Sequence, residues 1–376
     1  MATMIQREEN NKARTSSSSW LQLPSDLLCE IAKRINSYDD FISFGAVCPS
    51  WRSAAINENF NRSPQIPWLL LRTNGCSPVL FNNSKRKFHK PYLPEANSRY
   101  DPCFSFASHG WLLIQTSQIF LLHPLTRRKI LLPEVIKKSV ELIHFTIELS
   151  FKAALSSSPT CTENFSVVVT YHRGLAFYKS GHSNWTYLVV DGVTRILDVI
   201  FFKDQFYFLD NRGRILVLEV EDDFKTRVIL QLPYAVFIHA VYEFQKCYHL
   251  VEMELSKSKS LMLVLQRKRD FSHTEAFEVF KLNFENGKCE EVERLDNKAL
   301  FLGQNSSLCV DVKRRSFRTG YMANRIYFID TEAASRYRVG REKNLGIYNM
   351  QTGRIERSFA NNCAYLSPLM WIELLP

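Results

Sequence analysis

The sequence predicts a multi-domain protein in which a small all-α unit of three helices is followed by a large all-β domain. Near the N-terminus, between residues 20 and 60, apolar residues recur at the spacing of amphipathic helices. From Pro67 onward they form short runs broken by turn residues, which is typical of strands. A chain of 376 residues is long enough for one small and one large domain.

The helical unit is clearest over residues 23–55, LPSDLLCEIAKRINSYDDFISFGAVCPSWRSAA. Pro24 suits the first turn of a helix, where its missing N–H costs nothing. Leu27, Leu28, Ile31 and Ile35 follow at helical spacing and predict a first helix with one apolar face.

Two further helices are predicted after it. Ser37-Tyr38-Asp39-Asp40 resembles a capping box that opens the second helix, with Asp40 in place of the usual Glu. An apolar stripe predicts the third helix, and it comprises Val47, Cys48, Trp51, Ala54 and Ala55. So small a unit cannot bury this much apolar surface alone, so we expect a partner to cover the remaining face.

The segment resembles the F-box, the adaptor-binding module of SCF-type cullin–RING ubiquitin ligases. The matching residues are Leu23, Pro24, Asp26, Leu27, Leu28, Ile31, Asp40, Phe44, Val47, Cys48, Trp51 and Arg52. The resemblance implies that the apolar residues hold three helices together and dock them on a Skp adaptor. The implied adaptor-binding residues are Leu23, Pro24, Leu27, Leu28, Ile31, Ile35, Val47, Cys48 and Trp51. The alternative is a bare helical hairpin that packs on its own C-terminal domain.

Two residues depart from the favourable pattern. Gly45 stands where plant F-boxes often carry a basic residue, and a glycine weakens a helix by about 1 kcal/mol. Pro49 is acceptable only if the third helix begins near Val47 or Cys48, because a proline inside a helix costs about 3 kcal/mol. Either residue is expected to lower the affinity for the adaptor.

The remaining chain has the composition of a strand-rich domain, with 27 Phe and 15 Tyr in the whole sequence. Its predicted strands are the apolar runs Trp68–Leu71, Trp111–Ile114, Ile119–Leu122, Ser166–Val169, Val199–Phe202, Phe206–Leu209, Ile215–Val220, Leu261–Leu265, Phe277–Leu282 and Ile326–Ile329. So many strands at short spacing indicate a sandwich, a barrel or a propeller.

A recurring unit distinguishes these folds. It consists of a strand, a polar turn, a basic residue and a second strand, with clear copies at 119–130, 206–215, 280–289 and 347–355 and a weaker copy at 177–185. The markers Lys129, Asn184, Arg214, Lys288 and Arg354 are 55, 30, 74 and 66 residues apart. This uneven spacing favours propeller blades with loops of different length, and six or seven blades of about 40–50 residues fit the chain after residue 60.

Residues 66–375 resemble the KIB-type β-propeller, which follows the F-box in a large family of plant F-box proteins. The resemblance rests on segments 108–113, 121–126, 276–283, 299–304 and 362–365, and on Trp371-Ile372. It implies a kelch-like propeller that recruits substrates. The domains are therefore expected at 1–19 (a disordered arm), 20–60 (the F-box) and 61–376 (the propeller). The Ser-rich stretch 153–164 and the Lys/Ser segment 256–260 depart from the family and are expected to be surface loops.

Positive charge is concentrated after residue 60. Residues 1–60 hold six Lys/Arg and seven Asp/Glu, whereas residues 61–376 hold 42 and 31, a net charge of +11. Basic clusters occur at 85–87, 127–129, 267–269 and 313–315. We expect Arg127, Arg128 and Lys129 to steer an acidic or phosphorylated target. The alternative is that the clusters are solvated turns. Nucleic acid is not expected, because the aromatic residues lie within apolar strand runs.

No catalytic, cofactor-binding or metal-binding residue is expected. The sequence contains no G-x-S-x-G, H-E-x-x-H or P-loop motif, and the nine cysteines include no C-x-x-C pair. Scattered cysteines indicate reduced thiols and a cytoplasmic or nuclear location, and no apolar run is long enough to span a membrane.

The sequence thus predicts the substrate-recognition subunit of an SCF-type ubiquitin ligase. Its partners would be a Skp adaptor, the cullin and RING subunits behind it, and a target protein. Two alternatives stay open. In the first, the chain is a non-catalytic scaffold or inactive paralogue that joins no ligase. In the second, it is a propeller enzyme, which ordered polar residues in the central channel would favour.

Overall fold

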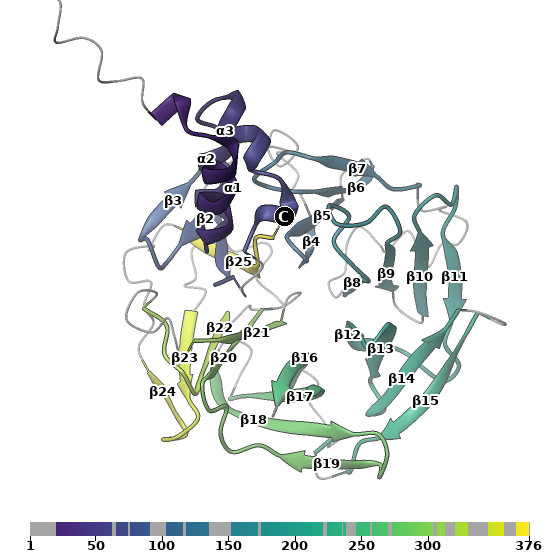
Figure 1. Cartoon of the computed structure of the whole chain (residues 1–376). Coiled ribbons are helices and arrows are strands. Elements are labelled where there is room, and N and C mark those ends of the chain that lie inside the picture. Colours follow the sequence, from purple (N-terminus) through teal and green to yellow (C-terminus); the bar gives the residue numbers. More distant parts are fainter. Residues whose placement is uncertain are drawn as a thin grey trace, which may run out of the picture. The chain divides into compact units, whose positions relative to one another are not determined.

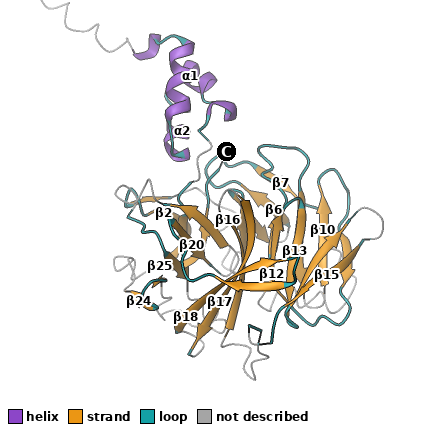
Figure 2. Ribbon diagram, turned by 60° about the horizontal axis from the view of Figure 1, so that its bottom comes forward, coloured by secondary structure: helices purple, strands orange, loops and turns teal. Residues whose placement is uncertain are grey.

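The computed structural model describes residues 20–61, 65–73, 76–90, 103–115, 118–134, 152–171, 174–220, 224–234, 236–237, 246–255, 258–269, 273–303, 307–312, 320–329, 345–356 and 366–375. The N-terminal arm expected at 1–19 lies outside these ranges. The chain divides into a unit at 1–65 with the last two residues, and a second unit at 66–374. Helices occur in the first unit and strands in the second (Figures 1 and 2).

The first unit contains the three predicted α-helices between two short 3-10 helices. These are η1 (Trp20–Gln22), α1 (Ser25–Arg34), α2 (Tyr38–Gly45), α3 (Pro49–Ala54) and η2 (Asn57–Asn59). Pro24 is the residue that caps the start of α1, and Pro49 is the first residue of α3. Both prolines therefore stand where an N–H is not needed, and Pro49 carries no penalty.

The core of the helical unit is largely aromatic. Tyr38, Phe41 and Phe60 are buried, and their rings lie 5.0–6.4 Å apart. Leu28 and Ala32 of α1 are also buried. Aromatic pairs at such distances add about 0.5–1.5 kcal/mol to the effect of burial, which helps so small a unit to fold.

The start of α2 differs in detail from the predicted capping box. Ser37 is the N-cap residue, as predicted, but its side chain makes no capping hydrogen bond. The Ser37 hydroxyl instead donates to the carboxylate of Asp39. The two acidic residues in the first turn, Asp39 and Asp40, still favour the positive end of the helix dipole.

Gly45 has a packing role that the sequence did not reveal. It is buried at the end of α2, and a Cβ placed there would lie 2.8 Å from the Cβ of Ala55. Helices α2 and α3 can approach this closely only because residue 45 has no side chain. The glycine therefore supports the F-box instead of weakening it.

The second unit is a propeller of six sheets arranged around a ring (Figure 1). From the innermost strand outward, blades 1–3 are β25 (Leu366–Ile372), β1 (Trp68–Thr73), β2 (Cys76–Asn82), β3 (Lys87–His89); β4 (Cys103–Ser108), β5 (Trp111–Gln115), β6 (Ile119–Leu122), β7 (Lys129–Leu131); and β8 (Ala153–Leu155), β9 (Ser166–Tyr171), β10 (Gly174–Lys179), β11 (Thr186–Val189). Each is antiparallel throughout.

Blades 4–6 complete the ring. They are β12 (Ile196–Phe202), β13 (Gln205–Asp210), β14 (Arg214–Glu219), β15 (Lys225–Gln231); β16 (Lys246–Leu255), β17 (Ser258–Lys268), β18 (Thr274–Asn283), β19 (Lys288–Glu291); and β21 (Ser307–Asp311), β20 (Lys298–Leu302), β22 (Arg325–Ile329), β23 (Leu345–Asn349), β24 (Arg354–Glu356). All ten predicted apolar runs fall in strands, and the blade number is six.

Blade 6 departs from the four-stranded pattern. Strand β20 pairs with β21 on one side and runs parallel to β22 on the other, which gives a five-stranded sheet. Tyr321, in the connection between β21 and β22, is fully buried against Phe301 and Tyr327. This aromatic contact secures the extra crossover inside the blade.

The ring closes by pairing the two ends of the domain. Strand β25 lies antiparallel to β1, with Trp68 opposite Ile372 and Leu70 opposite Met370. The apolar C-terminal segment thus completes the first blade from Leu366 onward. Residues 363–365 lie outside the described residues.

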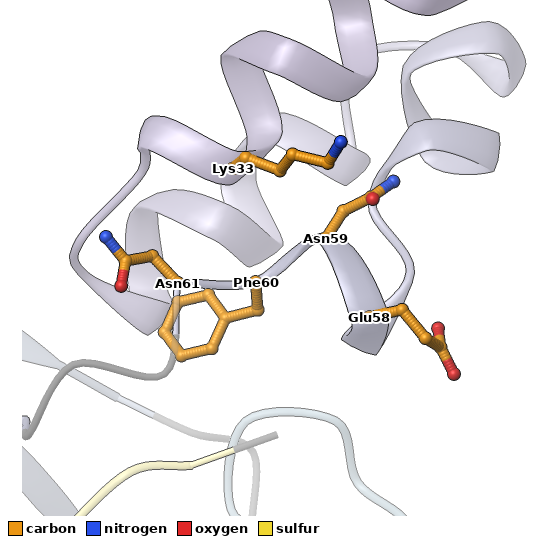
Figure 3. A pocket seen from close by; sticks show the side chains of 5 residues that line it. All are labelled: Lys33, Glu58, Asn59, Phe60 and Asn61. Atoms are coloured by element: carbon orange, nitrogen blue, oxygen red, sulfur yellow. The ribbon is translucent and has the colours of Figure 1, made fainter.

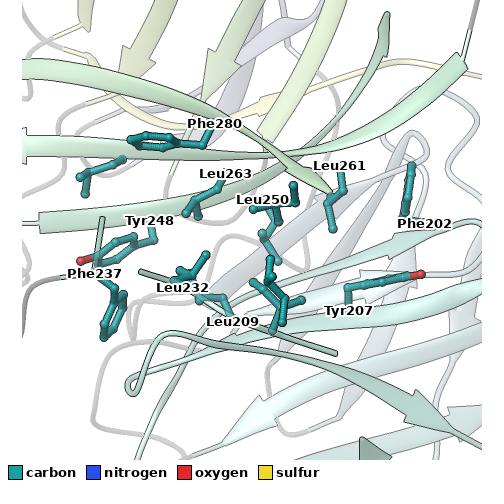
Figure 4. Close-up of a cluster of buried hydrophobic side chains, with 14 of the residues drawn as sticks. Phe202, Tyr207, Leu209, Leu232, Phe237, Tyr248, Leu250, Leu261, Leu263 and Phe280 are labelled. Atoms are coloured by element: carbon teal, nitrogen blue, oxygen red, sulfur yellow. The ribbon is translucent and has the colours of Figure 1, made fainter. Parts of the chain in front are cut away.

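Neighbouring blades are joined by apolar clusters. Between blades 4 and 5, Leu209 and Tyr207 face Leu250, Leu263 and Phe280 (Figure 4). Similar clusters join blades 2 and 3, 3 and 4, 5 and 6, and 6 and 1. Because each blade buries both faces, its central strands read as continuous apolar runs in the sequence.

Two segments expected to be surface loops prove to be partly structural. Residues 153–155 form the innermost strand of blade 3, and Ser158 and Thr160 accept hydrogen bonds from the indole N–H of Trp111 at 3.3 and 3.2 Å. Residues 258–260 begin strand β17. Both segments are rich in short polar residues, which are typical of loops, so these structural roles could not be predicted from the sequence.

Candidate interaction surfaces

The helical unit exposes apolar side chains along one face of α1. Pro24, Leu27 and Ile31 are spaced three and four residues apart, so they lie on the same side of the helix. Pro24 is exposed, and Leu27 and Ile31 are 52% and 37% exposed. A Leu left in water forgoes about 1.5–3 kcal/mol that burial would provide.

The exposed apolar face continues at the N-terminus and beside α3. The indole N–H of Trp51 donates to the backbone carbonyl of Trp20 at 3.3 Å, and the Trp51 ring lies 4.6 Å from that of Phe44. Trp51 thus links α3 to η1 and to the core. Trp20 is 66% exposed and Val47 is 53% exposed.

The predicted adaptor-binding residues divide into three groups by burial. Pro24, Leu27, Ile31 and Val47 are exposed; Leu23, Ile35, Cys48 and Trp51 are half-buried; and Leu28 is buried. Leu28 therefore acts on a partner only through the stability of α1. The exposed apolar residues Trp20, Leu21 and Ile56 were not predicted. They flank the motif, where neither helical spacing nor a family position marks them.

A hollow of about 420 Å³ lies between α1 and η2, lined by Lys33, Glu58, Asn59, Phe60 and Asn61 (Figure 3). Its two asparagine side chains are engaged within the unit. The amide of Asn59 donates to the carbonyl of Ala54 at 2.9 Å, and that of Asn61 donates to Asn36 at 2.8 Å. The hollow is therefore explained by the way η2 is fastened to the helices.

The three residues expected to steer a target differ in exposure. Arg128 and Lys129 are exposed, and the Lys129 ammonium lies 4.0 Å from the centre of the Phe120 ring. Arg127 is half-buried, with a φ of 64° in the turn between β6 and β7. Arg127 thus belongs partly to the fold, and only its two neighbours present their charge freely to solvent.

Polar groups do converge on the innermost strands of the propeller. Lys152, just before β8, lies 3.4 Å from the carboxylate of Asp198 on β12. Asp198 also accepts a hydrogen bond of 2.7 Å from the backbone N–H of Leu250 on β16. Ser307 of β21 lies 3.4 Å from Nδ1 of His249 on β16. This network links blades 3, 4, 5 and 6.

The protonation of the network suits a structural role better than a catalytic one. Burial lowers the pKa of His249 to about 3, with Lys152 contributing in the same direction. Burial also raises the pKa of Asp198, although Lys152 opposes that shift. His249 is therefore neutral near pH 7, and each polar group bonds another member of the network. No three His, Cys, Asp or Glu residues of the described part of the chain are placed to hold a metal ion.

Further histidines and adjacent pairs of acidic residues occur at separate places along the propeller sequence. His109 is half-buried in the turn between β4 and β5, and burial lowers its pKa. Glu290 and Glu291 are both exposed on β19. His239 and Asp222-Asp223 lie outside the described residues. No helix of the described chain is long and apolar enough to cross a membrane.

Comparison with known proteins agrees with both units. Residues 20–63 match the F-box domain model, and residues 80–349 match the KIB1-4 beta-propeller model. Among Arabidopsis thaliana proteins, F-box protein At2g17036 is 25% identical over 94% of this chain and 93% of its own length. F-box protein SKIP23 is 28% identical over 53% of this chain and 55% of its own. The chain therefore belongs to the KIB1-4 β-propeller family and is a plant F-box protein with a C-terminal propeller of six blades.

Proposed function

We propose that the protein is the substrate-recognition subunit of an SCF-type cullin–RING ubiquitin ligase. The observation that carries this proposal is the exposed apolar face of the F-box, formed by Trp20, Pro24, Leu27, Ile31 and Val47. An apolar face on so small a module marks a surface that a partner covers. The F-box match favours a Skp adaptor as that partner.

The propeller would then bind the target protein. Its blades are held together by continuous apolar clusters and present loops and turns at both ends of each sheet. Such loops on a rigid scaffold are where recognition residues concentrate. The contribution to ubiquitination is proximity: a target held near a charged conjugating enzyme reacts without the entropic cost of a bimolecular encounter. The reaction would take place where reduced thiols persist, in the cytoplasm or nucleus.

Two other functions are less well supported. A scaffold that joins no ligase would follow if Gly45 and Pro49 lowered adaptor affinity, but both residues fit the F-box fold. A propeller enzyme would use polar groups at the central channel. Those groups are present as Lys152, Asp198, His249 and Ser307, but they are engaged with one another.

The test is co-purification of the full chain with a Skp adaptor and a cullin. Leu27→Ala with Ile31→Ala should lower adaptor affinity by about tenfold or more while melting stays unchanged, since both side chains are exposed. Val189→Ala, at a side chain 62% exposed on the propeller, should leave adaptor binding unchanged. The matched core variant Leu28→Ala should instead cost about 2–5 kcal/mol of stability.

Adaptor binding that is unaffected by the Leu27/Ile31 pair would contradict the proposed docking face. A wild-type chain that binds neither adaptor nor cullin would favour the scaffold. Binding of the adaptor without the cullin would favour an assembly that stops short of a ligase.

A further inference from the structure

The positive charge of the propeller is confined largely to blades 1 and 2. Residues 61–133, which include strands β1–β7, hold ten Lys/Arg and two Asp/Glu, a net charge of +8. Residues 134–376 hold 32 and 29, a net charge of only +3. Blades 1 and 2 are neighbours in the ring, because β25 packs beside β4. Eight of the ten cations lie in the described part of blades 1 and 2 and therefore in one sector of the propeller.

Four of the blades share one turn between their last two strands. A polar residue at the end of the earlier strand accepts a turn N–H: Asn82 from Lys85, His123 from Thr126, Asn283 from Glu285, and Asn349 from Gln351, at 2.9–3.2 Å. This side-chain-to-backbone bond is the physical basis of the sequence repeat. Because all four turns connect the last two strands of a blade, they open on the same side of the ring.

The fourth residue after the capping residue has a left-handed backbone in all four turns. In blades 5 and 6 it is Gly287 or Gly353, with φ of 67° and 63°. In blades 1 and 2 it is Arg86 or Arg127, with φ of 49° and 64°. Glycine adopts this conformation freely, whereas a residue with a Cβ pays about 1–2 kcal/mol. Blades 1 and 2 thus carry an arginine at the position where the same turn elsewhere carries glycine.

Three of the cations on these two turns make no ion pair with a described carboxylate. No carboxylate of the described chain pairs with Arg86, Lys87 or Arg128, and all three are exposed. Several arginines of the other blades are neutralised locally, as with Arg214–Asp210 at 2.6 Å, Arg227–Glu219 at 2.6 Å and Arg325–Glu356 at 3.2 Å. Exposed, unpaired cations on two adjacent blades, one of them (Arg86) held in a left-handed backbone, indicate a surface that an anion completes.

We propose that the surface formed by Arg86, Lys87 and Arg128 binds an acidic segment of the target protein. This inference rests on the proposed function, in which the propeller holds the target. It also extends the sequence prediction: the cluster at 85–87 in blade 1 is added to Arg128 in blade 2, and half-buried Arg127 mainly shapes the turn. An acidic peptide segment fits better than a nucleic acid, whose bases would stack on several exposed rings. Of the two rings nearest the turns, Phe88 is 43% exposed and packs on Phe81 at 4.7 Å, whereas Phe120 is buried under Lys129.

The experiment measures binding of a fluorescent peptide rich in Asp and Glu to the full chain, with a Gln/Asn-substituted peptide as the neutral probe. Arg86→Glu, Lys87→Glu and Arg128→Glu together should weaken binding of the acidic peptide by about tenfold or more and reduce its dependence on salt. The matched control reverses Lys179, Lys288 and Arg354, exposed cations at the corresponding hairpins of blades 3, 5 and 6. It should change affinity by less than about twofold.

A single substitution separates binding from folding. Arg86→Gly removes one cation and also relieves the left-handed backbone, so it should raise the melting temperature while weakening binding of the acidic peptide. Gly287→Arg places a cation at the matching turn of blade 5, where no atom lies within 4 Å of the added Cβ, and should not alter binding.

Equal loss with both triple variants, or no loss with either, would overturn the proposal. Tighter binding of a single-stranded oligonucleotide than of the acidic peptide, abolished by the same triple, would overturn it in favour of nucleic acid. The same preparations are assayed for Skp adaptor binding. Retained adaptor binding without peptide binding refutes this inference alone, whereas loss of adaptor binding by the wild type refutes the proposed function.

Discussion

The roles of single residues in this protein cannot be predicted from residue type alone. Neighbours Leu27 and Leu28 occupy the same motif, yet one is 52% exposed and the other 1%. Asp198 and His249 look like catalytic side chains but are enclosed in a network between blades. In each case the surroundings of the side chain, which depend on residues distant in sequence, decide what it does.

The burial of His249 makes stability depend on pH. Its pKa is about 3 in the folded chain and about 6.5 in an unfolded one, so the unfolded state binds a proton first as the pH falls. The stabilising contribution is complete above pH 6.5 and is lost progressively below it, at about 1.4 kcal/mol per pH unit. Unfolding in urea at pH 7.5 and 5.5 should show this loss.

The histidine responsible can be identified by substitution. His249→Gln should flatten the pH dependence between 7.5 and 5.5, while His182→Gln, at an exposed histidine, should leave it as in the wild type. An equally steep loss of stability in the His249 variant would assign the dependence to other groups.

At the scale of elements, local sequence signals predicted which segments form helices and strands. Contacts between residues distant in the sequence decided how the strands pair. All ten apolar runs are strands because central strands of a blade are buried on both faces. The parallel pairing of β20 with β22 was not predictable, since pairing partners are chosen by non-local contacts such as that of Tyr321 with Phe301. The marker Arg214 also made the predicted spacing irregular, because it follows the second strand of blade 4, whereas the other markers follow the last strand but one of their blades.

The candidate sites show the same division. The F-box surface was predictable because its residues form a dense motif in one segment. The basic surface was only half predictable: the clusters are visible in the sequence, but the shared left-handed position of Arg86 and Arg127 emerges only when four hairpins are superposed. The density of charge in the sequence predicted Arg127 as part of the basic surface, but its side chain is half-buried.

The close approach of α2 and α3 yields a prediction at this scale. Gly45→Ala should destabilise the F-box by about 1–3 kcal/mol, because the new Cβ would lie 2.8 Å from that of Ala55, far inside ordinary contact. Thermal unfolding of the full chain, followed by a probe in the helical unit such as Trp51 fluorescence, measures the effect. Combining it with Ala55→Gly should restore much of the loss, and a lone Gly45→Ala variant of unchanged stability would show that the helices can separate at no cost.

The whole propeller is a closed ring that depends on its last described strand. Trp371 of β25 is fully buried, and its indole N–H donates to the carbonyl of Leu302 in blade 6 at 3.2 Å. Its ring lies 5.1 Å from that of Phe301. One side chain thus ties the first blade, through the C-terminal strand, to the sixth. A ring without this strand would leave β1 as an unpaired inner edge, which invites aggregation.

Deleting residues 361–376 should therefore abolish soluble expression of the protein, while the milder Trp371→Ala should cost about 3–5 kcal/mol through the cavity it leaves. Soluble yield and the midpoint of urea unfolding measure the two effects. Removing residues 1–19, which precede the first described helix, serves as a truncation of similar length that spares every described strand. Because β25 supplies every backbone hydrogen bond on one side of β1, the C-terminal deletion should be far more damaging than the N-terminal one. A C-terminally truncated chain with unchanged solubility and melting would mean that the ring is held by its inter-blade clusters alone, without the strand that closes it.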